Sequence, residues 1–225
     1  MQSRKTILVV SAHPDDDVLG CGGVIAKHAS FGDKVHLIFM TNGISARDTA
    51  LEIDISNRQI STQKAAHILG IESMQQFDFP DNKMDTVPLL DVVQSIEGVV
   101  SRLQPEIIYT HHIGDLNVDH QVVHKAVMTS CRSQPGFCVK SIYAFEVLSS
   151  TEWQTPGYLP FTPNVFIDIS NQIQIKRKAL KFYNQEMRPM PHTRNIDNVI
   201  RLNALRGNTV GVDYAEAFML LRSMQ

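Results

Sequence analysis

Short apolar runs and longer amphipathic stretches alternate along most of the chain. The first run, at residues 6–12, is rich in β-branched side chains and predicts a strand buried on both faces of a sheet. Similar runs predict strands at residues 35–41, 76–79, 107–110, 141–148 and 165–169. Helical periodicity and helix start and stop signals predict helices at residues 18–30, 56–69, 89–103, 119–131, 172–183 and 196–205.

This alternation predicts an α/β fold with a mostly parallel sheet flanked by helices. A chain of 225 residues has room for one large domain, and no repeat, low-complexity tract or change of composition marks a boundary. We therefore expect a single domain over residues 1–225. Residues 150–163, which are rich in proline, are the longest predicted surface loop.

Charge and cysteine content narrow the class of function. The formal net charge is −2, so the chain lacks the excess of lysine and arginine needed to coat a nucleic acid or an anionic membrane. Its three cysteines form no C-x-x-C pair, which argues against a disulfide framework and favours a reducing, cytoplasmic setting. No apolar segment approaches the ~20 residues that span a bilayer. We expect a cytoplasmic protein that acts on small molecules, without a nucleic-acid partner or membrane insertion.

Histidines and aspartates gather where the predicted strands end. In an open parallel sheet, ligands bind beyond the carboxyl ends of the strands. The segments at that edge are 13–17 after the first strand, 41–43 after the second, Asp81 after the third and 111–120 after the fourth. Side chains from distant parts of the chain are therefore expected to form one site.

The segment Gly20-Cys-Gly-Gly23 follows the first strand, as phosphate-binding loops do. Its spacing is not G-x-G-x-x-G, and the aspartates at 15–17 occupy the turn in which a pyrophosphate would lie. Electrostatic repulsion therefore argues against a dinucleotide site. The better interpretation is that Gly22 and Gly23 let a helix pack closely against the sheet.

An acidic turn that carries a histidine suits a metal cation instead. His13 and Asp16 lie three residues apart in a strand-to-helix turn and can face one point, and His120 offers a third ligand. Two histidines and one carboxylate are typical of hydrolytic zinc sites, although the same set holds Fe(II) in oxygenases. His124 shares a helix face with His120 and competes with it as a ligand; we favour His120.

The sequence also suggests which carboxylates orient the metal-binding histidines. Asp119 and Asp115 lie close to His120 along the chain, and either carboxylate can hold an imidazole in its ligating tautomer. We assign this orienting role to Asp119.

These motifs resemble those of a known family. Ala12-His-Pro-Asp-Asp-Asp17, followed by Gly20-Cys-Gly-Gly23 and by Asp119-His120, is similar to the PIG-L/LmbE-like zinc-dependent N-acetylglucosamine deacetylases. The similarity runs over nearly the whole chain. Asp17 stands where the family usually has glutamate, at a position that does not contact the metal.

The resemblance implies a Rossmann-like fold and one Zn²⁺ per chain, with Fe²⁺ or another divalent metal as the alternative. It implies that His13, Asp16 and His120 bind the metal. It also implies that Asp15 is the general base, which takes a proton from water as the water attacks an amide carbonyl.

One position departs from the family pattern. Many members have a second histidine three residues before the downstream ligand, where it stabilises the oxyanion, and this chain has Asn117. An amide donates a hydrogen bond but carries no positive charge, so we expect another catalytic group beside Asn117. His111, His112 and His192 are candidates. We favour His192, because residues 186–194 are unusually dense in charged and imidazole groups for a connector.

Substrate-binding residues also follow from the resemblance. Arg58 matches a family arginine that contacts sugar or phosphate, although a solvated residue at a helix start is an equally good interpretation. Asp81 resembles a carboxylate that binds sugar hydroxyls. Arg188, Arg47 and Arg206 are further cations that can meet a phosphate, and we select Arg188 among them.

The segments 115–120 and 186–189 are similar to a bacterial branch of the family that is often associated with surface-polysaccharide sugars. We therefore expect a hydrolase that removes the N-acetyl group from an amino sugar carried on a nucleotide, a lipid or another anionic group. The alternatives are a hydrolase of another amide or carbamoyl substrate and a catalytically silent sugar- or nucleotide-binding protein. Family members often form small homo-oligomers, and the resemblance leaves room for one here.

Overall fold

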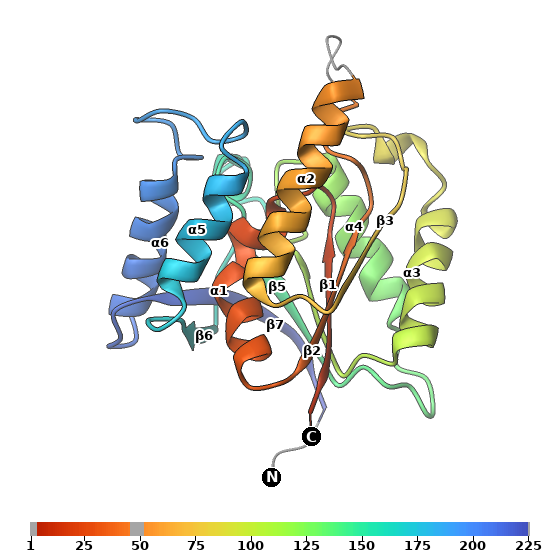
Figure 1. Ribbon diagram of the computed structural model, residues 1–225. Coiled ribbons are helices and arrows are strands. Elements are labelled where there is room, and N and C mark those ends of the chain that lie inside the picture. The colour runs from red at the N-terminus through yellow and green to blue at the C-terminus, as the bar shows by residue number, and fades with distance from the viewer. Residues whose placement is uncertain (1–3, 46–51, 225) are drawn as a thin grey trace.

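The structure, a computed structural model, describes residues 4–45 and 52–224 and contains one seven-stranded sheet with the strand order β3-β2-β1-β4-β5-β7-β6 (Figure 1). The strands are β1 (Thr6–Ser11), β2 (Lys34–Phe39), β3 (Ser73–Gln76), β4 (Ile107–His111), β5 (Ser141–Phe145), β6 (Val165–Asp168) and β7 (Ala215–Ser223). Strands β1 to β5 pair in parallel, whereas β7 runs antiparallel to β5 and β6. The predicted single α/β domain with a mostly parallel sheet is confirmed.

Helices cover both faces of this sheet (Figure 1). The helices are α1 (Asp16–Ser30), α2 (Glu52–Leu69), α3 (Leu89–Leu103), α4 (Val118–Ser130), α5 (Ile173–Phe182) and α6 (Ile196–Asn208), with 3₁₀ turns η1 (Met84–Thr86) and η2 (Thr151–Trp153). On one face, Ile7 and Val9 of β1 pack in a core shared with α1, α2, α5 and α6. On the other face, Leu8 and Val10 pack in a core shared with α3 and α4. Strand β1 is thus buried on both faces, as its apolar run predicts.

Two strands differ from the sequence prediction. Strand β3 lies three residues before the predicted 76–79 and is largely exposed, because it is the edge strand beside β2 and needs no apolar run. Strand β7 is not predicted from the sequence. It follows the predicted helix at residues 196–205, which is the last predicted element. It inserts between β5 and β6, so its place in the sheet depends on pairing with residues far away in the chain.

The glycines of α1 serve close packing. A side chain at Gly20 would collide with the ring of Phe145, and one at Gly23 would come within 2.7 Å of Ile169. The packing interpretation is therefore confirmed for Gly23, whereas a side chain at Gly22 would meet Val18 of the same helix at 3.2 Å. The helix lies close enough to the sheet to place its first turn at the strand ends.

A buried ion pair stabilises α1 where the helix is interrupted at Cys21. Glu216 of β7 accepts hydrogen bonds from the backbone N–H groups of Gly23 (2.8 Å) and Val24 (2.7 Å). Lys176 of α5 donates to Glu216 (2.6 Å) and to the carbonyl oxygen of Leu19 (2.9 Å). The pair thus supplies partners to backbone groups that the break in the helix would leave unpaired.

Among residues 4–45 and 52–224, no helix combines the length and the apolar character needed to cross a membrane.

Candidate metal centre

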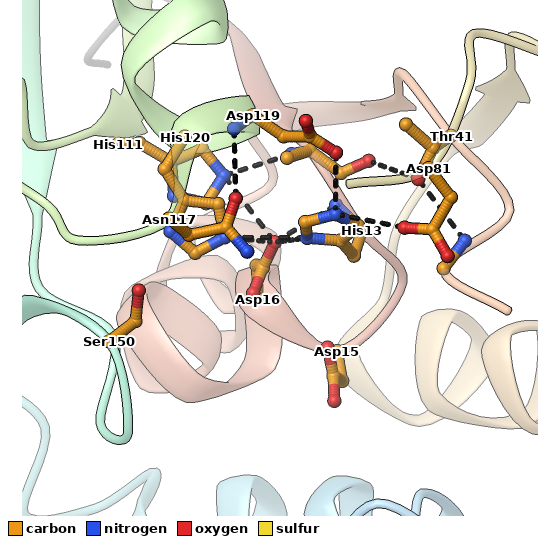
Figure 2. Close-up of polar contacts among 12 residues, drawn as sticks. His13, Asp15, Asp16, Thr41, Asp81, His111, Asn117, Asp119, His120 and Ser150 are labelled. Atoms are coloured by element: carbon orange, nitrogen blue, oxygen red, sulfur yellow. Dashed lines mark hydrogen bonds and ion pairs between the residues drawn. The ribbon is translucent and has the colours of Figure 1, made fainter. Parts of the chain in front are cut away.

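The carboxyl ends of β1 and β4 bring the predicted chemistry to one edge of the sheet. His13 follows β1, Asp16 begins α1, and His120 lies in the first turn of α4. Figure 2 shows these side chains converging, with Asp81 beside His13. His13 and His120 are 107 positions apart in the chain, and their rings meet here.

Three candidate ligand atoms form a nearly equilateral triangle. Asp16 Oδ2 lies 3.2 Å from His13 Nδ1 and 3.2 Å from His120 Nε2, and the two ring nitrogens are 3.3 Å apart. Ligands at tetrahedral positions about 2.0–2.1 Å from a zinc ion lie roughly 3.3 Å from one another. All three side chains are buried. The donor types and their spacing therefore fit a divalent metal of the zinc class.

Carboxylates hold the far side of the His13 ring. His13 Nε2 lies 3.1 Å from Asp119 Oδ2 and 3.2 Å from Asp81 Oδ1. His13, Asp81 and Asp119 are close enough to form a second candidate ligand group. Asp119, however, already accepts backbone N–H bonds from Asn82 (2.7 Å) and Met84 (3.0 Å). It is therefore better placed to orient His13 than to bind a metal.

Another carboxylate lies beside the ring of His120. Its Nδ1 lies 3.1 Å from Asp115 Oδ1. Asp115 in turn accepts hydrogen bonds from the hydroxyl groups of Ser150 and Thr151, the second at 2.6 Å. The ring of His111 stacks on that of His120 at 3.8 Å between centroids. These contacts leave His120 Nε2 facing Asp16 and His13.

The charges around the triangle favour a cation. Burial alone would lower the pKa of His120, but the carboxylates of Asp115 and Asp16 raise it to about 9. Burial would raise the pKa of Asp16, but His120 and His13 hold it well below the usual carboxyl range. A site that draws positive charge onto a buried histidine is suited to a divalent ion, which would replace the protons.

Asp15 is next to Asp16 but belongs to a different environment. It precedes α1 with a left-handed backbone (φ 110°, ψ −28°), and Figure 2 shows its carboxylate pointing away from the triangle. Its Oδ2 lies 3.4 Å from Arg194 Nη1 and 3.7 Å from Arg58 Nη1. Burial raises the pKa of Asp15, and the two arginines oppose that rise.

A cavity of about 330 Å³ opens beside the triangle. It is lined by His13, Asp15, Gly43, Arg58, Asp81, Asn82, Asn117, His120, Glu186 and Arg194. The lining is almost wholly polar, so the cavity suits a substrate rich in hydroxyl and amide groups.

Two residues that the sequence selects lie outside this cavity. The ring of His192 packs edge-on against Trp153 at 5.6 Å, and His192 Nδ1 accepts a hydrogen bond from the backbone N–H of Arg194. Arg188 is exposed, donates to the carbonyl oxygen of Gln185 and lines a separate cavity.

The other candidates are also placed elsewhere. His112 Nε2 donates to the carbonyl oxygen of Leu159, and His124 Nδ1 donates to that of His111. Arg206 pairs with Glu146 away from the cavity. Arg47 lies outside the described residues.

Three cavity residues escape the sequence analysis: Asn82, Glu186 and Arg194. Glu186 Oε1 lies 3.2 Å from Arg58 Nη2, and Arg194 Nε donates to Ser149 Oγ at 2.7 Å. The density of charge in residues 186–194 was a usable signal. It did not indicate which of the polar side chains in that segment turn inward.

Comparison with known proteins finds a matching family model and relatives that the chain covers over most of their length. The family model described as PIG-L, GlcNAc-PI de-N-acetylase, matches residues 8–131. The chain is 32% identical over 184 residues to the protein named uncharacterized deacetylase YaiS of Escherichia coli (strain K12), covering 79% of this chain and 90% of that protein. It is 30% identical over 196 residues to 4-oxalmesaconate hydratase of Pseudomonas putida, covering 79% of this chain and 72% of that protein.

Among solved structures, N,N'-diacetylchitobiose deacetylase from Pyrococcus horikoshii superimposes with a TM-score of 0.79. The match covers 98% of this chain and 85% of that chain, with 19% sequence identity. At this identity the similarity shows a shared fold.

Proposed function

The chain belongs to the PIG-L family, and from this premise we propose that it is a metal-dependent hydrolase that removes the acetyl group from an N-acetylated amino sugar. The observation that carries the proposal is the contrast between two adjacent aspartates. Asp16 lies in the ligand triangle, whereas Asp15 turns away from it and still lines the cavity. A protein that only binds a sugar has no use for a separate buried carboxylate beside the metal ligands.

The metal is proposed to be one Zn²⁺ held by His13, Asp16 and His120, and Fe²⁺ or another divalent ion suits the same donors. When bound, the ion would lower the pKa of water and polarise the acetyl carbonyl. Asp119 orients the ring of His13, and Asp115 orients that of His120.

Asp15 moves the protons of the reaction. Its carboxylate accepts a proton from the water that attacks the acetyl carbon, and it then returns a proton to the amine nitrogen as the C–N bond breaks. The products are acetate and the free amino sugar. Because burial raises the pKa of Asp15, this carboxyl holds a proton more readily than an exposed aspartate, which suits a group that accepts and returns one.

Arg58, Asp81 and Asn117 line the cavity, and we assign them to the sugar and its acetamido group. Arg188 and His192 are left out of the proposed set, because both lie outside the cavity. The resemblance to a bacterial branch supports a sugar linked to a nucleotide or a lipid carrier of a surface-polysaccharide pathway. The unpaired cysteines Cys21, Cys131 and Cys138 support a cytoplasmic setting.

The similarity to a hydratase favours one second candidate, the addition of water to a carbon–carbon double bond of a tricarboxylate. The cavity argues against it. Asp15, Asp81 and Glu186 line the cavity along with the two arginines, and both arginines already face carboxylates. A tricarboxylate would therefore bring three further negative charges to a wall whose two arginines already face Asp15 and Glu186.

The test is acetate release by the zinc-loaded protein from N-acetylhexosamines presented free, as nucleotide conjugates and as lipid-linked forms. An unsaturated tricarboxylate serves as the hydratase arm, and its hydration is monitored by the loss of its ultraviolet absorbance. The control is Asp15→Asn, which we expect to keep its zinc and to lose about 10²–10⁴-fold in kcat. Turnover that survives in Asp15→Asn would overturn the base assignment. Hydration with no acetate release would overturn the deacetylase itself.

A further inference from the structure

The cavity contains two arginines, and their surroundings differ. Arg58 Nη2 lies 3.2 Å from Glu186 Oε1 and donates to the carbonyl oxygen of Gly43 at 3.2 Å. Its side chain is 7% exposed, and its guanidinium lies over the ring of Tyr183. Arg58 is therefore engaged on several sides and has little freedom to meet a reacting group.

Asn117 is engaged as well. Its Oδ1 accepts the N–H of Asp119 at 2.8 Å, as the N-cap of α4, and its Nδ2 donates to Asn82 Oδ1 at 3.1 Å. These contacts fix the amide but supply no charge. The side chain of Asn117 therefore brings no positive charge to the cavity.

Arg194 is the remaining cation among the residues that line the cavity. Its Nε donates to Ser149 Oγ at 2.7 Å, and its backbone N–H donates to His192 Nδ1 at 3.0 Å. These two contacts aim the guanidinium at Asp15, with Nη1 3.4 Å from Asp15 Oδ2. Although burial acts to lower it, the carboxylates of Asp15 and Asp16 raise the pKa of Arg194, so the side chain carries its charge throughout the working pH range.

We propose that Arg194 is a catalytic residue of this chain, whose guanidinium stabilises the negative charge on the acetyl oxygen and so supplies the charge that Asn117 lacks. The proposal rests on the deacetylase function proposed above. Ser149 and His192 are positioning residues, because they act through Arg194. His192 thus keeps a place in the site, although the structure puts its ring against Trp153 and outside the cavity.

When water attacks the acetyl carbon, Asp15 loses its negative charge as the acetyl oxygen gains one. Water attacks the acetyl carbon, one proton passes to Asp15, and the electron pair of the carbonyl π bond moves onto the acetyl oxygen. Asp15 thereby becomes neutral at the moment when that oxygen becomes negative. The guanidinium, which faces Asp15 in the resting protein, is then released from its partner as a new anion forms nearby. When the C–N bond breaks, the carbonyl re-forms and Asp15 returns the proton to the amine.

The experiment compares Arg194→Gln and Arg194→Lys with Arg177→Gln, which removes an arginine that also pairs with an aspartate, Asp197, but outside the cavity. All proteins are zinc-loaded and matched for metal content. We expect Arg194→Gln to lose about 10²–10³-fold in kcat with little change in KM, as is typical when an oxyanion donor is removed. Guanidinium ion added to Arg194→Gln should restore part of the rate, and the Arg177→Gln control should not respond.

The pH profile distinguishes stabilisation of the acetyl oxygen by Arg194 from an effect of Arg194 on the pKa of Asp15 alone. Removing a positive charge next to Asp15 raises the pKa of that carboxyl, so the acid limb of the profile moves to higher pH. If the rate of Arg194→Gln reached that of the wild type on the alkaline side, Arg194 would only tune the base and the proposal would be overturned. A loss that persists there supports it.

Binding of acetate gives a readout that does not depend on turnover. Acetate is the product carboxylate, and titration calorimetry on the zinc-loaded protein measures its affinity directly. We expect Arg194→Gln to weaken acetate binding by about tenfold or more, as for loss of a charge-assisted hydrogen bond. Unchanged affinity would overturn the proposal. If the wild type binds acetate through Arg194 but releases none from the sugar panel, the deacetylase assignment has failed and the anion-stabilising role of Arg194 has not.

Discussion

Two parts of the chain build the cavity in different ways. The metal wall, formed by the ligand triangle of His13, Asp16 and His120, lies within residues 8–131. His13 and Asp16 follow the buried strand β1, and His120 lies in the first turn of α4. The charged wall, formed by Glu186 and Arg194, lies beyond residue 131 on an irregular segment between α5 and α6. The sheet fixes the metal wall, whereas the charged wall is held by side-chain contacts that a few substitutions can change. We therefore expect metal binding to reside in the first wall, and stabilisation of the acetyl oxygen and substrate choice in the second.

The largest effect is expected from removing a ligand of the metal wall. His120→Ala leaves two of the three donors. We therefore expect zinc affinity to fall by more than the roughly 100-fold loss seen when a residue that only hydrogen-bonds to a ligand is replaced, and activity to fall to background. Metal content after dialysis, measured by mass spectrometry, checks this. His124→Ala, one turn further along α4, is the matched control and should keep its zinc, because His124 Nδ1 is bonded to the carbonyl oxygen of His111. If His124→Ala lost its zinc and His120→Ala kept it, the ligand would be His124 and our choice of His120 would be wrong.

The second-largest effect is expected on stability, from the buried ion pair between Glu216 of β7 and Lys176 of α5. Glu216→Gln leaves the fully buried Lys176 without its anionic partner, so we expect the free energy of unfolding to fall by about 3–5 kcal/mol. Urea unfolding monitored by circular dichroism measures it. Glu106→Gln, at the exposed pair with Lys140, is the control and should change stability by about 0–1 kcal/mol. Similar losses for the two variants would show that the buried pair has no special role in holding α1.

The same division explains what the sequence could predict. His13, Asp16 and His120 stand at the ends of strand or helix patterns, so local periodicity and the rule for parallel sheets were enough to bring them together. Arg194 and Glu186 lie in no strand or helix pattern. The direction of their side chains depends on contacts with Ser149 and Arg58. Strand β7 escaped prediction for a related reason. Its pairing partners lie far along the chain, and sequence patterns describe only local structure.

A smaller effect is expected behind the metal wall. Asp119→Asn removes the charge that orients His13 Nε2 and keeps the shape of the side chain. We expect zinc affinity to fall by about 10–100-fold, as for other carboxylates that hold a ligating histidine. Competition with a chromophoric chelator measures it. Asp91→Asn, on the exposed first turn of α3, should leave the affinity unchanged. An equal affinity for the two variants would show that Asp119 does not orient the ligand.

The smallest effect is expected at the charged wall, where it tests whether substrate choice resides in that wall. Glu186 lies 3.2 Å from Arg58, so Arg58 is largely neutralised as a site for a substrate phosphate. In Glu186→Gln, Arg58 loses one of its two anionic neighbours and keeps Asp15. We expect kcat/KM for a phosphorylated N-acetyl sugar to rise about tenfold relative to its unphosphorylated counterpart at low salt. Glu146→Gln, which frees Arg206 outside the cavity, should leave the ratio unchanged. Because zinc affinity should stay the same in both variants, a shift in substrate ratio alone would place specificity in the charged wall. A fall in zinc content would show instead that the two walls are not separable.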